Sequence, residues 1–236
     1  MGTLDKLVEA ILEDPGYACG ERSFAERIDI DDAIVVLDDF YAAHDEADQQ
    51  LPEVAKKMRR TIACQSGCNG CCESLFLVST TEAHAVAREL SKPERENDRA
   101  EFELAAAVWL SRAGDRADEA AASFAEERTT RYISLVRAHG LDHIMCPLNR
   151  DGACTVYEVR PLPCRQGWVL DTSDYCTPSD DPNQPDAQLV THKAYEDLVA
   201  TGRQLSAGLQ NALGDGVKRK PLVRAVLDAL ESMQRT

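Results

Sequence analysis

The sequence predicts an all-α protein in which a helical, bundle-like scaffold carries two cysteine-rich loops. Apolar residues recur at helical spacing along most of the 236 residues, and residues 79–140 are rich in Ala, Glu and Arg, which favour helix. Strand signals are scarce and do not alternate with helices, so neither a Rossmann sheet nor a TIM barrel is expected. The polar stretch 171–187 contains several prolines and is predicted to be an irregular loop.

Start and stop signals place the individual helices. Ser79 and Glu82 have the spacing of a capping box, which opens a helix. Pro52 and Pro93 suit a first helical turn, and Gly140 suits a helix end. The predicted helices cover residues 4–12, 31–50, 52–64, 80–90, 93–113, 115–140, 188–212 and 221–233, with short extended pieces at 155–157 and 168–170.

The length and composition fit a single domain over residues 1–236. With 44% hydrophobic and 28% charged residues, the chain is ample for one buried core. We expect a cysteine-cluster core formed by about 40–90 and 140–177, followed by C-terminal helices at about 188–236. The stretch between the two halves of this core, about 91–139, is predicted to be a helical insertion.

The charge balance limits the classes of partner. The net charge is −15, and residues 29–48 hold only acidic charges, with no Lys or Arg. Such a surface would repel nucleic-acid phosphate, so no nucleic-acid partner is expected. The acidic run and the basic runs 56–60 and 218–220 are interpreted as solvated helix faces or ends. A protein or small-molecule partner and the oligomeric state stay open.

The chain shows no membrane or secretion signal. No apolar stretch reaches the length of about 18 residues that spans a bilayer, so no membrane association is expected. The first residues lack the apolar run of a secretory signal and the myristoylation pattern. The protein is therefore predicted to be cytoplasmic, where thiols stay reduced and a disulfide framework is not expected.

Eight of the nine cysteines fall into two groups that predict a metal site. Metal binding requires several thiolates that converge on one point, and cysteines two or three residues apart on a tight turn can wrap one ion. Gly67 and Gly70 allow such a turn in the first group. Ordinary core cysteines would not fall four within nine residues, as this group does. The first group is Cys64, Cys68, Cys71 and Cys72, and the second is Cys146, Cys154, Cys164 and Cys176.

The adjacent pair Cys71 and Cys72 indicates more than one simple site. Side chains of neighbouring residues diverge, so we expect one of the pair to serve each of two sites, or one to lie behind the other. Eight cysteines suffice for two four-thiolate sites, or for one cluster and a spare reactive pair. Cys19 lies outside both groups and is expected to be an ordinary thiol.

Spacing alone does not decide between zinc and an iron–sulfur cluster, since four thiolates hold either. The C-x3-C-x2-C spacing of the first group also occurs in radical S-adenosylmethionine enzymes, but no strand–helix barrel follows it here. His139 and His143 are alternative ligands, although a helix-end role suits them better. Arg160 and Arg165 flank Cys164, where guanidinium groups would stabilise a negative thiolate site. We favour an iron–sulfur cluster of the [4Fe–4S] type over Zn²⁺, because excess cysteines and an adjacent pair suit a reactive cluster.

The motifs around these cysteines resemble those of a known family. Residues 64–82 combine a C-x3-C-x2-C-C run with a helix that opens on Ser/Thr and Glu, and residues 146–165 contain C-P-L, D-G-A-C-T-V-Y-E-V-R-P and C-R. Both segments resemble the YkgJ-like CxxCxxCC proteins, a zinc- or iron-chelating domain, to which the flagellin lysine N-methylase is distantly similar. The resemblance implies metal binding by the first seven of the eight cysteines, with Cys176 where a further cysteine often occurs.

Three classes of function follow from these expectations. The first is a metal-binding protein that holds an iron–sulfur cluster or zinc through clustered cysteines. The second is a metal-dependent modifying enzyme such as a protein lysine N-methyltransferase, which a polar pocket beside the metal would favour. The third is a helical interaction module with a structural zinc site, which an exposed apolar patch on residues 93–139 would favour. No P-loop, G-x-G-x-x-G or G-x-S-x-G motif occurs, so nucleotide binding and serine hydrolysis are not predicted.

Overall fold

A computed structural model gives the fold of residues 9, 12–14, 27–64, 67–179, 181, 184, 189, 193–216 and 218–235. This part of the chain is mostly helical, which confirms the predicted all-α class. Two pairs of very short antiparallel strands accompany the helices, β1 (Leu77–Val78) with β4 (Lys220–Pro221) and β2 (Asn149–Arg150) with β3 (Ala153–Cys154). The helices are α3 (Ile30–Asp48), α4 (Leu51–Lys57), α5 (Thr80–Leu90), α6 (Glu96–Ala125), α7 (Thr129–Leu141), α8 (Leu162–Arg165), α9 (Lys193–Leu213) and α10 (Leu222–Gln234), with short 3-10 helices η1 (Gly70–Glu73), η2 (Pro93–Arg95) and η3 (Tyr157–Val159).

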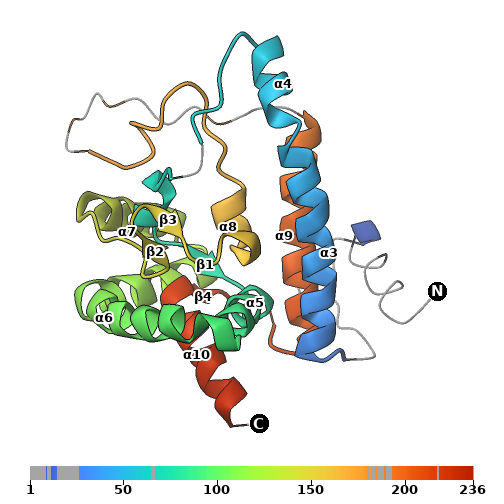
Figure 1. The fold of residues 1–236 in the computed structure, drawn as a ribbon, viewed down its shortest axis with the longest axis vertical. Coiled ribbons are helices and arrows are strands. Elements are labelled where there is room, and N and C mark those ends of the chain that lie inside the picture. Colours follow the sequence, from blue (N-terminus) through green and yellow to red (C-terminus); the bar gives the residue numbers. More distant parts are fainter. Residues whose placement is uncertain are drawn as a thin grey trace.

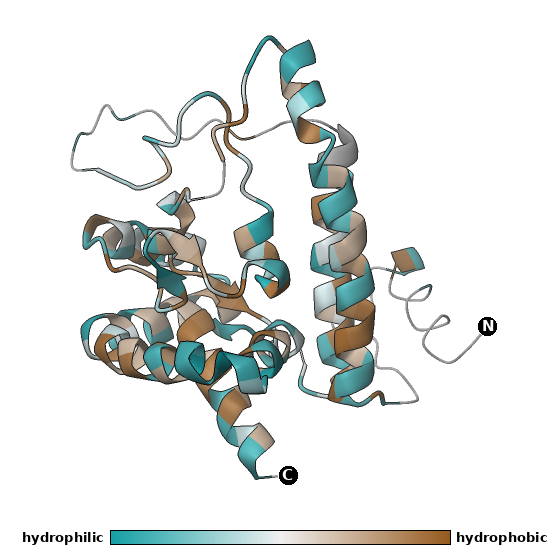
Figure 2. Cartoon of the chain, viewed as in Figure 1, coloured by the Kyte–Doolittle hydropathy of each residue, from teal (hydrophilic) through white to brown (hydrophobic). Residues whose placement is uncertain are grey.

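The helices pack in two groups that α5 joins (Figure 1). In one group α3 and α9 lie side by side and run antiparallel, and apolar residues alternate with polar ones along both (Figure 2). In the other group α6 packs against α7, and α10 packs against α5 and α6. Each group has its own apolar cluster, and α5 contributes Ala85 to the first and Val86 to the second. No helix of the described chain is both long enough and apolar enough to cross a membrane.

Capping contacts confirm two of the predicted helix starts. The Asp29 carboxylate accepts a hydrogen bond from the Asp32 amide at 2.9 Å, and α3 begins between these residues. In the capping box of α5, the Ser79 hydroxyl accepts from the Glu82 amide at 3.2 Å, and the Glu82 carboxylate accepts from the Ser79 amide at 2.8 Å. Most of the helix predicted over residues 4–12 lies outside the described residues.

The predicted helices 93–113 and 115–140 are wrong at their shared boundary. Helix α6 runs unbroken through this point, and the chain reverses only at Glu127, whose φ of 56° is left-handed. Gly114 stays helical because it is buried, with the Arg224 side chain 3.5 Å from where a Cβ would lie. The packing of α6 thus outweighs the cost of about 1 kcal/mol that a glycine adds to a helix interior.

The helix predicted over residues 52–64 is also wrong, because α4 is only seven residues long. Beyond it the chain becomes extended, and Ile62 forms a β-bridge with Leu170. This bridge confirms the extended piece predicted at 168–170, whereas at 155–157 the chain leaves β3 through a turn and enters η3. Pairing with a distant segment therefore overrides the local helical preference before the first cysteine group.

His139 of α7 is expected to make the stability of the fold depend on pH. Its side chain is fully buried against Trp109, with ring centroids 5.5 Å apart. Burial and the nearby Arg116 lower the pKa of this imidazole from 6.5 to about 4, although Asp142 acts in the opposite direction. The unfolded chain therefore binds a proton that the folded chain does not, and the free energy of unfolding should fall as the pH drops from 6.5 to about 4. Because the range ends where the folded imidazole is itself half protonated, we expect a loss of about 2 kcal/mol.

Chemical denaturation at a series of pH values measures this loss. The variant His139→Phe keeps an aromatic ring against Trp109 but cannot titrate, so its stability should fall by about 2 kcal/mol less than that of the wild type over the same range. His84→Gln is the matched control, since the ring of His84 is only part-buried and is hydrogen-bonded to the Thr80 carbonyl at 3.0 Å. Equal pH dependence in His139→Phe and the wild type would contradict the expectation.

Candidate metal centre

All eight cysteines of the two groups line one cavity of about 330 Å³. Each of them is a free thiol, and Cys71 is exposed whereas the other seven are half-buried. Cys19, the ninth cysteine, lies outside the described residues. The structure thus gathers around one cavity the eight cysteines that the sequence analysis grouped.

Backbone contacts hold the start of the first cysteine group against the chain that follows α8. The Ala63 amide donates to the Val169 carbonyl at 2.8 Å, and the Val169 amide donates to the Cys64 sulfur at 3.2 Å. The Asp171 carboxylate accepts a hydrogen bond from the Thr61 amide at 2.9 Å. These contacts satisfy polar backbone groups that would otherwise be left without partners, and they fix the position of the first thiol.

Three contacts hold η1 against the second cysteine group. The Cys146 amide donates to the Cys72 carbonyl at 2.7 Å, and the Asn149 amide group donates to the Cys72 sulfur at 3.3 Å. The imidazole of His143 lies 2.8 Å from the Glu73 carboxylate. His143, one of the two histidines considered as ligands, therefore ties the two groups together and does not line the cavity.

The β2–β3 hairpin brings Cys154 to the cavity. Cys154 lies opposite Asn149 in the antiparallel pair, and the two turn residues, an Asp-Gly dipeptide, have left-handed φ values of 52° and 85°. Arg150 anchors the hairpin on α6 through a hydrogen bond to the Asp98 carboxylate at 2.8 Å. Helix α6 thereby supports one wall of the cavity.

A buried carboxylate and a glycine position the remaining cysteines of the second group. Cys164 lies on α8, whose first residue, Leu162, donates its amide to the buried Glu82 carboxylate at 2.8 Å. Cys176 packs directly on Gly70, where an added Cβ would lie 2.8 Å from the Cys176 Cβ and 3.6 Å from its sulfur. Only a residue without a side chain permits this approach.

Burial keeps most of these thiols protonated at neutral pH. It raises the pKa of Cys146 to about 12 and that of Cys164 well above its usual value. Cys72 is the exception, because a hydrogen bond from Cys71 lowers its pKa to about 6. Several thiolates in one cavity repel one another, so only a positive centre among them would hold them all deprotonated.

Apart from the thiols, the cavity wall is mostly apolar and includes Trp109. Arg160 and Arg165, which the sequence places beside the site, also line it. Arg160 stacks on the Tyr157 ring at 4.0 Å, and its charge contributes to the lowered pKa of Cys72. Within the described chain, its Nε has no hydrogen-bond partner. None of the described residues that line the cavity is Asp, Glu or His.

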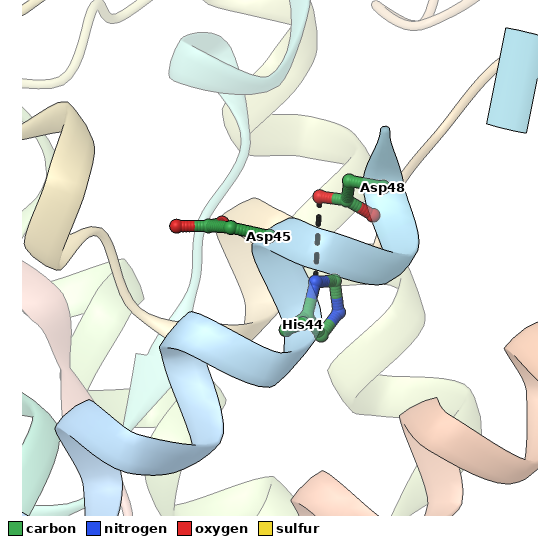
Figure 3. A group of neighbouring side chains, drawn as sticks. All are labelled: His44, Asp45 and Asp48. Atoms are coloured by element: carbon green, nitrogen blue, oxygen red, sulfur yellow. Dashed lines mark ion pairs between the residues drawn. The ribbon is translucent and has the colours of Figure 1, made fainter. Parts of the chain in front are cut away.

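A group that the sequence did not single out lies at the end of α3 (Figure 3). His44, Asp45 and Asp48 each place one ligand atom within 4.8 Å of the others, and His44 Nδ1 lies 3.3 Å from Asp48 Oδ2. Both carboxylates bind cavity-wall residues, since Asp48 accepts the Trp168 indole N–H at 2.9 Å and Asp45 pairs with Arg165. We therefore interpret this group as a clamp that orients the wall, and the i, i+4 spacing of His44 and Asp48 is its only sequence signal.

Among the described cysteines, no three sulfurs lie as close together as one zinc ion requires. Four thiolates at a Zn–S distance of about 2.3 Å stand about 3.8 Å from one another in a tetrahedron. Among the described residues, no three cysteines have sulfur atoms that all lie within 4.8 Å of one another. Thiolates that bind separate irons of one cluster are held farther apart than thiolates on a single ion. The described cysteines are therefore not arranged in advance around a single ion.

Comparisons with protein-family models, with curated proteins and with solved structures found no match. The resemblance to the CxxCxxCC family, and the metal binding that it implies, therefore stay predictions. The functional proposal below depends on the geometry of the cavity and the chemistry of its thiols.

Proposed function

We propose that this protein binds an iron–sulfur cluster, of the [4Fe–4S] type, through the thiolates that line its cavity. The observation that carries the proposal is that all eight cysteines, drawn from two segments far apart in the sequence, line the same space. Cysteines that served only core packing would not be expected to gather around one cavity. Clustered thiolates are the ligands that such clusters take.

One feature favours a cluster over a single zinc ion, and two more suit a bound cluster. Among the described cysteines, no three sulfurs lie as close together as tetrahedral zinc needs. The largely apolar wall limits the access of water to a bound cluster. The Arg160 guanidinium offsets the negative charge that four thiolates bring to it.

The two other classes of function have less support. An acid–base step requires a titratable group beside the metal, and apart from the cysteines the described lining offers the phenol of Tyr157 but no Asp, Glu or His. An interaction module is the second candidate, because the insertion exposes the apolar side chains Leu104, Val108 and Ile133. In that case the metal would be structural zinc.

Purification without oxygen, followed by metal analysis and a visible absorption spectrum, tests the proposal. We expect a brown protein that contains iron and acid-labile sulfide in equal amounts. A colourless protein with stoichiometric zinc would overturn the proposal in favour of the interaction module. Replacing the four cysteines of the first group by serine should abolish the colour. Cys19→Ser is the matched control and should leave the colour unchanged.

A further inference from the structure

The two arginines that line the cavity differ in the partners of their side chains. The Arg165 guanidinium is buried, pairs with the Asp45 carboxylate and stacks on the Tyr41 ring at 4.1 Å. It also donates hydrogen bonds to two backbone carbonyls, that of Arg160 at 2.9 Å and that of Glu158. Arg165 therefore ties α3 to the chain around η3 and α8, and a carboxylate already matches its charge.

The Arg160 guanidinium has no such partners. Among the described residues it forms no ion pair with a carboxylate, and its Nε is shielded from solvent without a hydrogen-bond acceptor. The side chain instead lies over the Tyr157 ring, with the guanidinium carbon 4.0 Å from the ring centroid. An aromatic ring attracts the charge of a guanidinium, but it supplies no lone pair to the N–H donors. Because a buried charged donor without an acceptor is unfavourable, the surroundings of Arg160 favour an anion beside it.

The backbone holds Arg160 close to a proposed metal ligand. Its carbonyl accepts the hydrogen bond from Arg165, and the next residue, Pro161, precedes α8. The Pro161 carbonyl accepts the Cys164 amide at 2.9 Å, so this thiol and the guanidinium belong to one short stretch of chain. Both line the same cavity, whose wall is otherwise mostly apolar. The positive charge is therefore in place before anything binds, in surroundings that strengthen its attraction for an anion.

We propose that Arg160 raises the reduction potential of the bound iron–sulfur cluster, by donating its Nε–H to a sulfur atom of the cluster or of a ligating thiolate. This inference rests on the proposed function, because it requires the cluster to be bound. Uptake of one electron from an external reductant adds a negative charge to the cluster. A fixed cation that also donates a hydrogen bond stabilises the reduced form more than the oxidised form. Arg165 is less suited to this role, because its guanidinium is committed to Asp45 and to backbone carbonyls.

A redox titration of the protein purified without oxygen, followed by electron paramagnetic resonance of the reduced cluster, tests the proposal. Arg160→Met keeps an apolar contact with the Tyr157 ring but removes the charge and the donor. At a fixed solution potential, its ratio of reduced to oxidised cluster should fall at least about tenfold, which corresponds to about 59 mV for one electron. Arg160→Lys keeps the charge but lacks the Nε–H, so it should show a smaller fall.

The matched control is Arg131→Met, which removes an arginine from an exposed ion pair with Glu119 and should leave the ratio within about twofold. The inference and the proposed function can fail separately. An intact cluster with the wild-type ratio in Arg160→Met would overturn the role of Arg160 but leave the proposed function standing. A wild type that contains neither iron nor sulfide would overturn both.

A second measurement uses the wild type and does not depend on a variant that folds. In protein made with isotopically labelled arginine, pulsed electron paramagnetic resonance of the reduced cluster should detect a coupled arginine nitrogen, because a hydrogen-bonded Nε lies close to the electron spin of the cluster. The coupling should disappear in labelled Arg160→Lys, in which this position carries no label. Absence of the coupling in the wild type, or its persistence in Arg160→Lys, would overturn the proposal.

Discussion

Replacing Glu82 with alanine should lower the free energy of unfolding by about 3 to 5 kcal/mol. The carboxylate is fully buried and accepts hydrogen bonds from the Ser79 and Leu162 amides, each at 2.8 Å. It also accepts the Ser206 hydroxyl at 3.3 Å and lies 3.7 Å from the Arg219 guanidinium. One side chain therefore joins α5, α8, α9 and the chain leading into β4. Alanine would leave these donors buried without an acceptor, which costs more than the hydrogen bonds themselves contribute.

Urea denaturation measures this loss, and two further variants locate its cause. Glu82→Gln keeps the shape but presents an amide to donors that need an acceptor, so it should lose about 1 to 3 kcal/mol. Glu231→Ala on α10 is the matched control, because it removes an exposed ion pair with Arg235 and should change stability by less than about 0.5 kcal/mol. A loss below about 1 kcal/mol in Glu82→Ala would mean that the network contributes little.

The parts of the fold that could be predicted are those decided within a few residues. The capping box at Ser79 depends on contacts three residues apart, and α5 begins where this signal places it. Helix α3 begins at Ile30, one residue before its predicted start, where the Asp29 carboxylate caps it. The wrong boundaries depend on distant partners. Gly114 remains helical because of the packing of α6, and residues after α4 become extended because Ile62 pairs with Leu170. The local sequence of neither segment predicts these distant contacts.

The cysteines that line the cavity could likewise be predicted from the sequence. The contacts that bring them together could not. Cysteine spacing is a local pattern, and all eight predicted cysteines line the cavity. The β2–β3 hairpin had a sequence signal, the dipeptide Asp151-Gly152, but no alternating run flanks it. The hydrogen bond from Trp168 to Asp48 joins residues more than a hundred positions apart, and so does the Thr61 contact with Asp171. Such contacts are settled by tertiary packing and leave no periodic pattern in the sequence.

Removing the metal from the proposed centre should open the loops around the cavity and leave the helical scaffold folded. The scaffold has its own apolar clusters, in which Leu90 of α5 and Val226 of α10 are fully buried. The cavity loops depend on few contacts, and the eight thiols add repulsion whenever they ionise without metal. Amides at the junctions of these loops, such as those of Cys146 and Val169, should exchange with solvent at least about 100-fold faster in the metal-free protein.

Hydrogen exchange of the metal-loaded and metal-free forms, compared without oxygen, measures this change region by region. Amides of α5 and α10 serve as internal controls and should keep their exchange rates within about twofold, because their protection comes from apolar packing. Equal protection of the Cys146 and Val169 amides in both forms would show that backbone contacts alone hold the loops together. That outcome is not expected, because metal–thiolate bonds can contribute about 10 kcal/mol or more to a folded site, whereas each of the few hydrogen bonds between the two segments contributes about 1 kcal/mol. The metal, rather than the chain, should therefore supply most of the stability that closes this cavity.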